Sequence, residues 1–156
     1  MKKQIRRASS AVLFALLLGS TAQAATLNTT ELGLLEVVND VRVANGVPPL
    51  EVDHTLVRAA RAHTGRMLRA DVLSHGSFGP RLGSFGARGP RFGENLAWGT
   101  GWSGSARALV RAWLASPGHR ANLLRRGFRR IGIGARIGTF AGYRGATVVT
   151  ADFAGR

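Results

Sequence analysis

Residues 113–124 read Trp-Leu-Ala-Ser-Pro-Gly-His-Arg-Ala-Asn-Leu-Leu, and the rest of the chain is interpreted outward from them. Ser116 followed by Pro117 predicts the start of a short helix, with serine as the N-cap and proline in the first turn. His119 falls in that first turn, where the positive end of a helix lowers the pKa of an imidazole. The neutral imidazole that results is the form that binds a metal ion or acts as a base.

Two more helices are predicted near the start of the domain. Apolar residues recur at helical spacing over 31–45, and Gly46 followed by two prolines ends that helix. Asp53 is the predicted N-cap of a second helix that reaches about Ala70. His63 falls on the apolar face of this second helix, where a satisfied, partly buried histidine is the simpler interpretation.

Residues 73–104 differ in composition from the segments before them, because glycines recur throughout. This composition predicts a long irregular loop with a short helical turn. Three Phe-Gly pairs recur every seven residues within it, and we interpret the phenylalanines as anchors that pin the loop to the core: Phe78, Phe85 and Phe92. A further helix begins after the loop, at Ser103 or Ser105.

The C-terminal part of the chain is strand-like. Apolar residues alternate over 128–137, residues 147–153 are β-branched and apolar, and a turn within 138–145 predicts a hairpin between them. Helices come first and strands late, so the expected class is α+β rather than a wound α/β sheet.

The N-terminus predicts export. A positively charged start, an apolar run over 11–18 and the pattern Ala22-Gln23-Ala24 are typical of a signal peptide over 1–24. An uncleaved membrane anchor is the alternative, but the run is short against the roughly 20 residues that a span needs. Residues 25–30 then form a lead-in and 31–156 a single domain, with no later segment able to span a bilayer.

Composition limits the chemistry. The chain carries 22 basic and 8 acidic residues and no cysteine. Disulfides, thiolate metal sites and cysteine nucleophiles are therefore excluded. The basic charge favours acidic polymers or anionic surfaces, and an exported protein meets cell-wall polymers and lipid head groups before nucleic acid. The arginines of 125–130 are interpreted as a solvated face, with a contact for wall polymer or anionic lipid as the alternative.

Few residues outside the helix surfaces could carry chemistry. His75 opens the Gly-rich segment and Glu94 is an acid within it, and binding groups concentrate on such loops. With His119 they offer two histidines and one carboxylate, a set that could hold Zn²⁺ or another divalent metal. Asn95 is a candidate partner beside them, although satisfying backbone groups is its simpler role.

The chain resembles the CAP superfamily, which includes the cysteine-rich secretory, antigen 5 and pathogenesis-related 1 proteins, and its bacterial secreted branch in particular. The resemblance covers roughly residues 31–154 and is carried by Ala59 to His63 with Met67, Leu73-Ser74-His75, Gly93 to Gly99, residues 113–124, Gly132-Ile133-Gly134 and Thr150 to Phe153. It implies an α-β-α sandwich, with helices on both faces of a small, mainly antiparallel sheet.

The resemblance also implies a central cleft with two histidines and two glutamates. His75 matches the first histidine and Glu94 the first glutamate. The second glutamate is replaced by Ser116, and the penultimate strand, expected to include 147–150, offers no second histidine. His119 is the candidate substitute, so the expected cleft is reduced to His75, Glu94 and His119.

Three functions are compatible with these features. The favoured one is a secreted binding module that holds a lipid, glycan or peptide of the cell envelope or its surroundings. The basic charge of the chain is compatible with an anionic ligand. The alternative is a hydrolase that activates water with metal or with a histidine base, because no Gly-x-Ser-x-Gly motif is present. A nucleic-acid binder is the third, and the predicted signal peptide argues against it.

Overall fold

The computed structural model describes residues 26–155, so the predicted signal peptide lies outside the described residues. The elements in chain order are α1 (Thr29–Ala44), β1 (Glu51–Val52), α2 (His54–Ala70), α3 (Phe78–Ser84), β2 (Phe92–Gly99), the 3₁₀ helix η1 (Gly101–Gly104), α4 (Ala106–Ala115), α5 (Pro117–Leu123), β3 (Phe128–Phe140) and β4 (Tyr143–Gly155). The part of the chain so described contains no helix long and apolar enough to cross a membrane.

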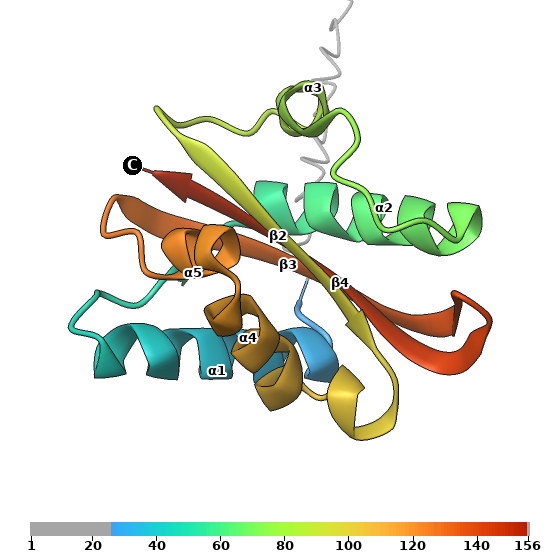
Figure 1. Ribbon diagram of the computed structural model, residues 1–156. Helices are drawn as coiled ribbons and strands as arrows, with labels where there is room; N and C mark the ends of the chain where they lie inside the picture. Colours follow the sequence, from blue (N-terminus) through green and yellow to red (C-terminus); the bar gives the residue numbers. More distant parts are fainter. Residues whose placement is uncertain (1–25, 156) are drawn as a thin grey trace, which may run out of the picture.

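The strands form one sheet in the order β1-β3-β4-β2. The long strands β3 and β4 pair antiparallel as a hairpin, β2 pairs antiparallel with β4, and β1 alone runs parallel to its neighbour β3. Helices α2 and α3 cover one face, and α1, α4 and α5 cover the other (Figure 1). The predicted α+β class and the three-layer sandwich are therefore confirmed.

The helices begin where short polar side chains can cap them. Asn28 forms a capping box with Glu31, so α1 begins two residues earlier than predicted. Asp53 caps α2 as expected, accepting from the backbone of Thr55 at 2.8 Å. Ser116 occupies the N-cap position of α5 but makes no side-chain cap hydrogen bond.

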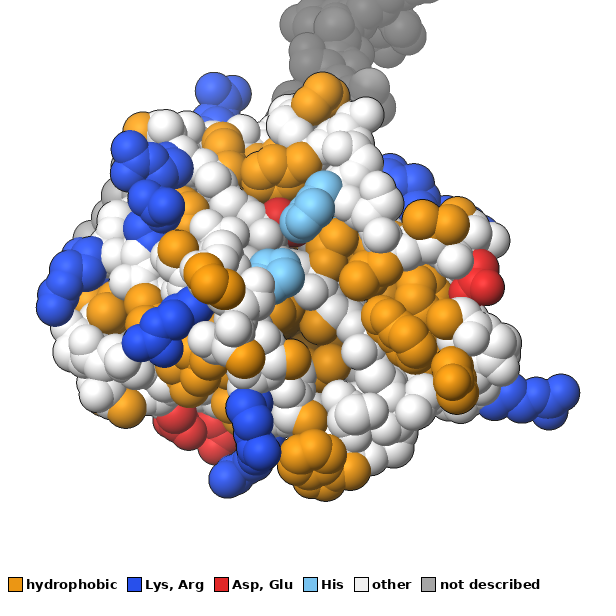
Figure 2. Space-filling view, in the orientation of Figure 1, with side chains coloured by type: hydrophobic (Ala, Val, Ile, Leu, Met, Phe, Trp, Pro, Cys, Tyr) orange, Lys and Arg blue, Asp and Glu red, His pale blue; other side chains and the backbone are white. Residues whose placement is uncertain are grey.

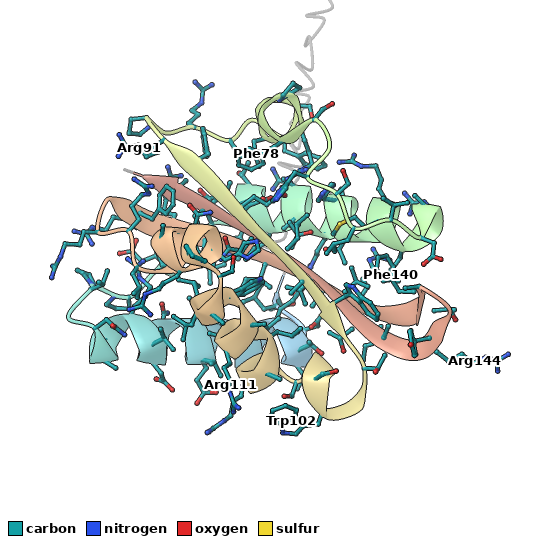
Figure 3. All side chains as sticks on the ribbon, in the orientation of Figure 1. Phe78, Arg91, Trp102, Arg111, Phe140 and Arg144 are labelled. Atoms are coloured by element: carbon teal, nitrogen blue, oxygen red, sulfur yellow. The ribbon has the colours of Figure 1, made fainter. Side chains whose placement is uncertain are left out.

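The larger core lies between the sheet and the layer of α1 and α4. Side chains of β3 alternate between the two faces of the sheet, so Ile131 and Ile133 both point into this core, where they pack in one cluster with the buried Trp113. The intervening Gly132 and Gly134 face α2, and a Cβ on either would overlap the helix backbone. Figure 3 shows side chains on both faces of the sheet, but at these two glycines the backbone of α2 approaches the strand directly.

The prediction of an irregular loop over 73–104 is wrong for much of its length. Residues 78–84 form α3 and residues 92–99 form β2, whose middle is buried against β4. Phe78, Phe85 and Phe92 do pack on the small core of Leu56, Ala59, Leu82 and Ala154. Glycines at both ends of the strand concealed it, because glycine is depleted in ordinary strands. Residues 147–150 also differ from expectation, since they lie on the last strand rather than the penultimate one.

Candidate functional site

Glu94 is the centre of a buried polar cluster on the α2–α3 face of the sheet. It lies on β2 and is only 6% exposed. His75, in the loop after α2, lies with Nδ1 2.7 Å from Glu94 Oε1, and Arg81 of α3 donates from Nη2 to Oε2. The side chain of His75 is 57% exposed, whereas that of Arg81 is 2% exposed. A buried carboxylate thus orients an imidazole that solvent can reach.

A second acid lies directly across the sheet. Asp152 of β4 is the register partner of Glu94 and is completely buried. Arg81 Nη2 also donates to Asp152 Oδ1 at 3.2 Å, so one guanidinium bridges two carboxyl groups. Burial, and then the neighbouring Glu94, raise the pKa of Asp152 well above its ordinary value. Within residues 26–155, Asp152 Oδ2 and Arg81 Nε have no hydrogen-bond partner.

His63 joins this cluster from α2. Its Nε2 lies 2.8 Å from the carbonyl of Ser74 and 3.9 Å from Glu94 Oε2. Burial, with a further contribution from Arg81, lowers the pKa of His63. The expected partly buried, satisfied histidine is therefore present, and it also lines the site.

His119 approaches from the opposite layer, on α5. The Asn95 side chain, next to Glu94 on β2, donates to the His119 carbonyl at 3.0 Å. Burial, followed by the nearby His75, lowers the pKa of His119. Figure 2 shows two histidine side chains close together on one face, with acidic atoms beside one of them. We call His75 and His119, with Glu94 beneath, the histidine surface.

The two asparagines of the signature stretches hold this arrangement together. Asn122 donates to the Glu94 carbonyl at 3.2 Å and to Asn95 Oδ1 at 3.0 Å. With the bond from Asn95 to His119, these contacts join α5 to β2 at the edge of the sheet. Satisfying backbone groups, the simpler role for both residues, is what the geometry supports.

The structure places the candidate residues in two groups. His75 and Glu94 are in contact, and His119 lies near His75, while Asn95 contacts the backbone of His119 and the side chain of Asn122. Sequence reasoning missed Arg81 and Asp152. Asp152 carries a readable signal, since it is the only acid in the apolar segment 147–153. Arg81 looks like any other arginine of a basic chain.

The donors as placed do not fit a divalent metal. Among the described residues, no three His, Asp or Glu side chains are grouped so that they could hold a metal ion. Both oxygens of Glu94 are already engaged, by His75 and by Arg81. The guanidinium occupies the position beside two carboxyl groups that a cation would take.

The other candidate features lie away from the cluster. Trp113 lies in the core and donates to the Leu96 carbonyl at 2.8 Å. Trp98 is half-buried against Phe140, and Trp102 is 69% exposed beside Arg111. The arginines of 125–130 are only partly a solvated face, because Arg130 pairs with Asp53 at 2.5 Å.

Comparison with known proteins identifies a matching protein family. The model of the CAP: Cysteine-rich secretory protein family matches residues 35–153. The uncharacterized protein YkwD of Bacillus subtilis is 32% identical over 120 residues, or 74% of this chain and 46% of that protein. The uncharacterized membrane protein YlbC of the same organism is 32% identical over 111 residues, or 68% of this chain and 31% of that protein. This chain therefore spans less than half the length of the curated relatives it matches.

Solved structures agree on the fold. An extracellular protein of Bacillus anthracis that contains an SCP domain superposes with a TM-score of 0.69 at 26% identity, covering 81% of this chain and 40% of that one. An outer surface protein of Borrelia burgdorferi superposes with a TM-score of 0.66 at 23% identity, covering 79% of this chain and 90% of that one. The second likeness, at lower identity, concerns the fold alone.

Proposed function

Because this chain belongs to the CAP, or cysteine-rich secretory protein, family, we propose that it is an exported binding protein whose histidine surface recognises a ligand of the cell envelope or its surroundings. The observation that carries the proposal is the pair formed by His75 and Glu94. An exposed imidazole is held in one orientation by a buried carboxylate, whose charge is balanced by Arg81. Such a preorganised group loses little freedom when it binds a ligand.

The chemistry of the surface favours a ligand rich in hydroxyl and amide groups. Because a carboxylate only accepts hydrogen bonds, the Nδ1 proton of His75 points to Glu94, which leaves Nε2 for a ligand. The lowered pKa of His119 favours its neutral form, which offers one donor and one acceptor. Hydroxyl and amide groups match this pattern, and both are abundant in the sugar and peptide parts of cell-wall polymers. We therefore place glycan or peptide ahead of lipid.

Export is supported by two independent observations. Residues 1–24 have the charged, apolar and small-residue regions of a signal peptide. The similar SCP-domain protein of Bacillus anthracis is extracellular. Fractionation of cells that express the full chain tests this part: the proposal expects the protein outside the cytoplasm, starting near Ala25. Retention of the intact chain in the cytoplasm would contradict it.

Binding is tested by sedimentation with insoluble peptidoglycan, using the purified protein and its His75→Gln variant. We expect His75→Gln to weaken binding about tenfold, the effect of losing one well-placed hydrogen bond to a ligand. His54→Gln is the matched control, since His54 is an exposed histidine in the first turn of α2. Salt of about 0.5 M suppresses non-specific attraction of this basic chain. Equal binding by His75→Gln and the unchanged protein would contradict the proposal.

A hydrolase remains the second candidate because the pair of His75 and Glu94 has the form of a base oriented by a carboxylate. In that case His75 would remove a proton from water, and no metal is required for the step. Turnover of peptidoglycan fragments, followed by released reducing ends or amines, separates the two functions. Activity lost in His75→Gln would favour the hydrolase, and intact fragments with tight binding would favour the binding protein.

A further inference from the structure

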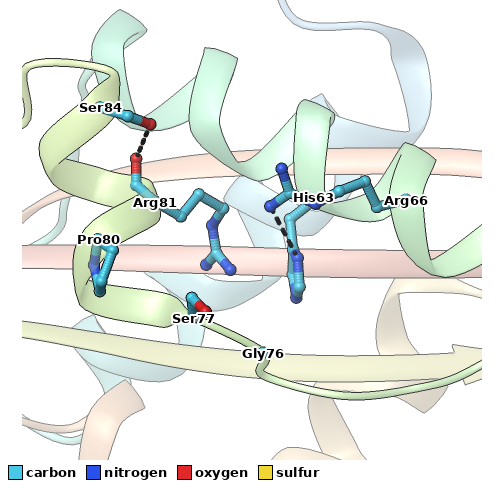
Figure 4. Close-up of a pocket in the computed structure, with 7 residues that line it drawn as sticks. All are labelled: His63, Arg66, Gly76, Ser77, Pro80, Arg81 and Ser84. Carbon is cyan, nitrogen blue, oxygen red and sulfur yellow. Dashed lines mark hydrogen bonds between the residues drawn. The ribbon is translucent and has the colours of Figure 1, made fainter.

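A cavity of about 340 Å³ lies on the α2–α3 side of the buried cluster. Its walls come from α2, the following loop and α3, and include Arg66, Ser77 and Arg81 (Figure 4). Figure 4 shows Arg81 and His63 reaching toward each other across the middle of this space. The volume falls in the range of sites for small molecules, about 300–1,000 Å³.

Three donors of this cavity are available to a ligand. Arg81 Nε is buried and has no acceptor among residues 26–155, although the other guanidinium nitrogens of Arg81 are engaged. Ser77 occupies the N-cap position of α3 but makes no side-chain cap hydrogen bond. Arg66 is exposed, and its Nη2 lies 3.4 Å from His63 Nδ1. A buried donor without an acceptor is unfavourable, so an acceptor from a ligand would stabilise this arrangement.

The charges around the cavity favour an anion. Arg66 and Arg81 both line it, and none of its seven wall residues is an acid. Glu94 and Asp152 are held by Arg81 Nη2 instead. Two guanidinium groups with one free hydroxyl are a donor set suited to a carboxylate, which guanidinium binds through planar, paired hydrogen bonds.

A second, smaller cavity of about 170 Å³ adjoins the first. The two share His63, Arg66 and Gly76, so they are neighbours on either side of these residues. The second is walled by apolar side chains, Met67, Ala70 and Val72. A polar compartment next to a small apolar one matches a molecule with a charged group and a few carbon atoms beside it.

We propose that these two cavities form a binding site for a carboxylate that carries a small apolar group. The carboxylate accepts hydrogen bonds from Arg81 Nε, Arg66 and Ser77, and the apolar group packs on Met67, Ala70 and Val72. A short branched carboxylic acid and a peptide C-terminus with a small side chain share this chemistry. The site adjoins the histidine surface, because Arg81 also contacts Glu94 and the His75 carbonyl. The proposal concerns a different ligand group and does not depend on the proposed function.

Calorimetric titration of the purified protein tests the proposal with three probes: isovalerate, N-acetyl-alanyl-alanine and the amide of that dipeptide. We expect at least one of the acids to bind and the amide to bind at least tenfold more weakly, because it lacks the charge that guanidinium recognises. Isovalerate alone would identify free acids as the ligand, and the dipeptide acid alone would identify peptide C-termini. Equal binding of acid and amide, or no binding of either acid, overturns the proposal.

Surface variants avoid the risk of unfolding. Arg66→Gln should weaken acid binding about tenfold, whereas Arg69→Gln, an exposed arginine of the same helix outside both cavities, should not change it. Ala70→Leu fills the apolar cavity with a residue that favours helix, so it should weaken isovalerate or the dipeptide but leave acetate unaffected. Equal loss in Arg66→Gln and Arg69→Gln would mean general charge attraction and would overturn the site.

Discussion

Two buried glutamates, each paired with an arginine, differ in how completely they are surrounded. Glu31 in α1 is fully buried and accepts from Arg61, from the backbone of Asn28 and from the backbone of Ala135. All of these partners are structural, and together they join α1, α2 and β3. Glu94 is almost as deeply buried, but one of its partners is the exposed His75.

The surroundings of Glu94 also leave groups unused. Asp152 Oδ2 and Arg81 Nε are buried without partners in the described part of the chain, and Asp152 places a second acid beside the first. Glu31 is thus enclosed by partners that join the scaffold, whereas the cluster around Glu94 holds α3 against the sheet and still leaves buried polar atoms without partners.

Glu31→Ala should produce the largest loss of stability. It removes a capping box and leaves Arg61 and the Ala135 amide without their acceptor, so we expect unfolding to become easier by about 3 kcal/mol. Chemical denaturation measures this, with Glu36→Ala, an exposed acid of the same helix, as the control. If Glu31→Ala lost less stability than Glu36→Ala, the described contrast between Glu31 and Glu94 would be contradicted.

Glu94→Gln should be less damaging, at about 2 kcal/mol. Asp152 remains in contact with Arg81. Loss of the Glu94 charge removes one cause of the raised pKa of Asp152, so Asp152 can ionise and balance the guanidinium. Denaturation measures the stability, and peptidoglycan sedimentation in the same variant measures binding, which should fall further than stability predicts. A loss of stability greater than that of Glu31→Ala would contradict the comparison.

Asp152→Asn should change stability by about 1 kcal/mol or less, with a sign that depends on pH. The raised pKa of Asp152 means that the folded protein holds a proton that the unfolded chain releases. This contribution is complete below the ordinary pKa of an aspartate and is lost as pH rises through the raised value. Denaturation at pH 5 and 8 measures the free energy of unfolding of both proteins. The stability of the variant relative to the unchanged protein should be greater at pH 8 than at pH 5. A greater relative stability of the variant at pH 5 would contradict the raised pKa of Asp152.

His63→Gln should have the smallest effect, about 0.5 kcal/mol, and the opposite pH dependence. The lowered pKa of His63 means that the folded protein disfavours the protonated ring. Stability from this residue is present above the ordinary histidine pKa and is lost as pH falls through the lowered value. The variant should lose less stability between pH 7 and 5 than the unchanged protein. If the stability of the two proteins depended on pH identically, protonation of His63 would not be linked to folding.

The sequence predicted most of the scaffold because its signals are local. Asp53 before an amphipathic run marks the start of α2, and the alternation around Ile131 marks β3. Strand β2 was not predicted, because residues 92–99 form a strand only by pairing with β4, which is distant in the sequence. Its buried positions include the acid Glu94 and Asn95, which no periodicity assigns to a sheet.

The candidate site was predicted only in part. The resemblance to the family pointed to His75 and Glu94, and the contact between them fits that expectation. Arg81 was missed because its role comes from α3 folding back over the sheet, which no local pattern indicates. Asp152 was missed because an acid at the end of a strand is usually exposed, and only the register with β2 buries it opposite Glu94.

The glycines that face α2 have a consequence for how this scaffold can vary. At Gly132 and Gly134 the strand and helix backbones are in direct contact, so at these two positions no side chain separates them. Core substitutions elsewhere can then alter packing without moving α2 relative to the sheet. We expect natural variants of this domain to keep that spacing and to diversify instead through the segment 71–91, so one rigid frame can present many different loops.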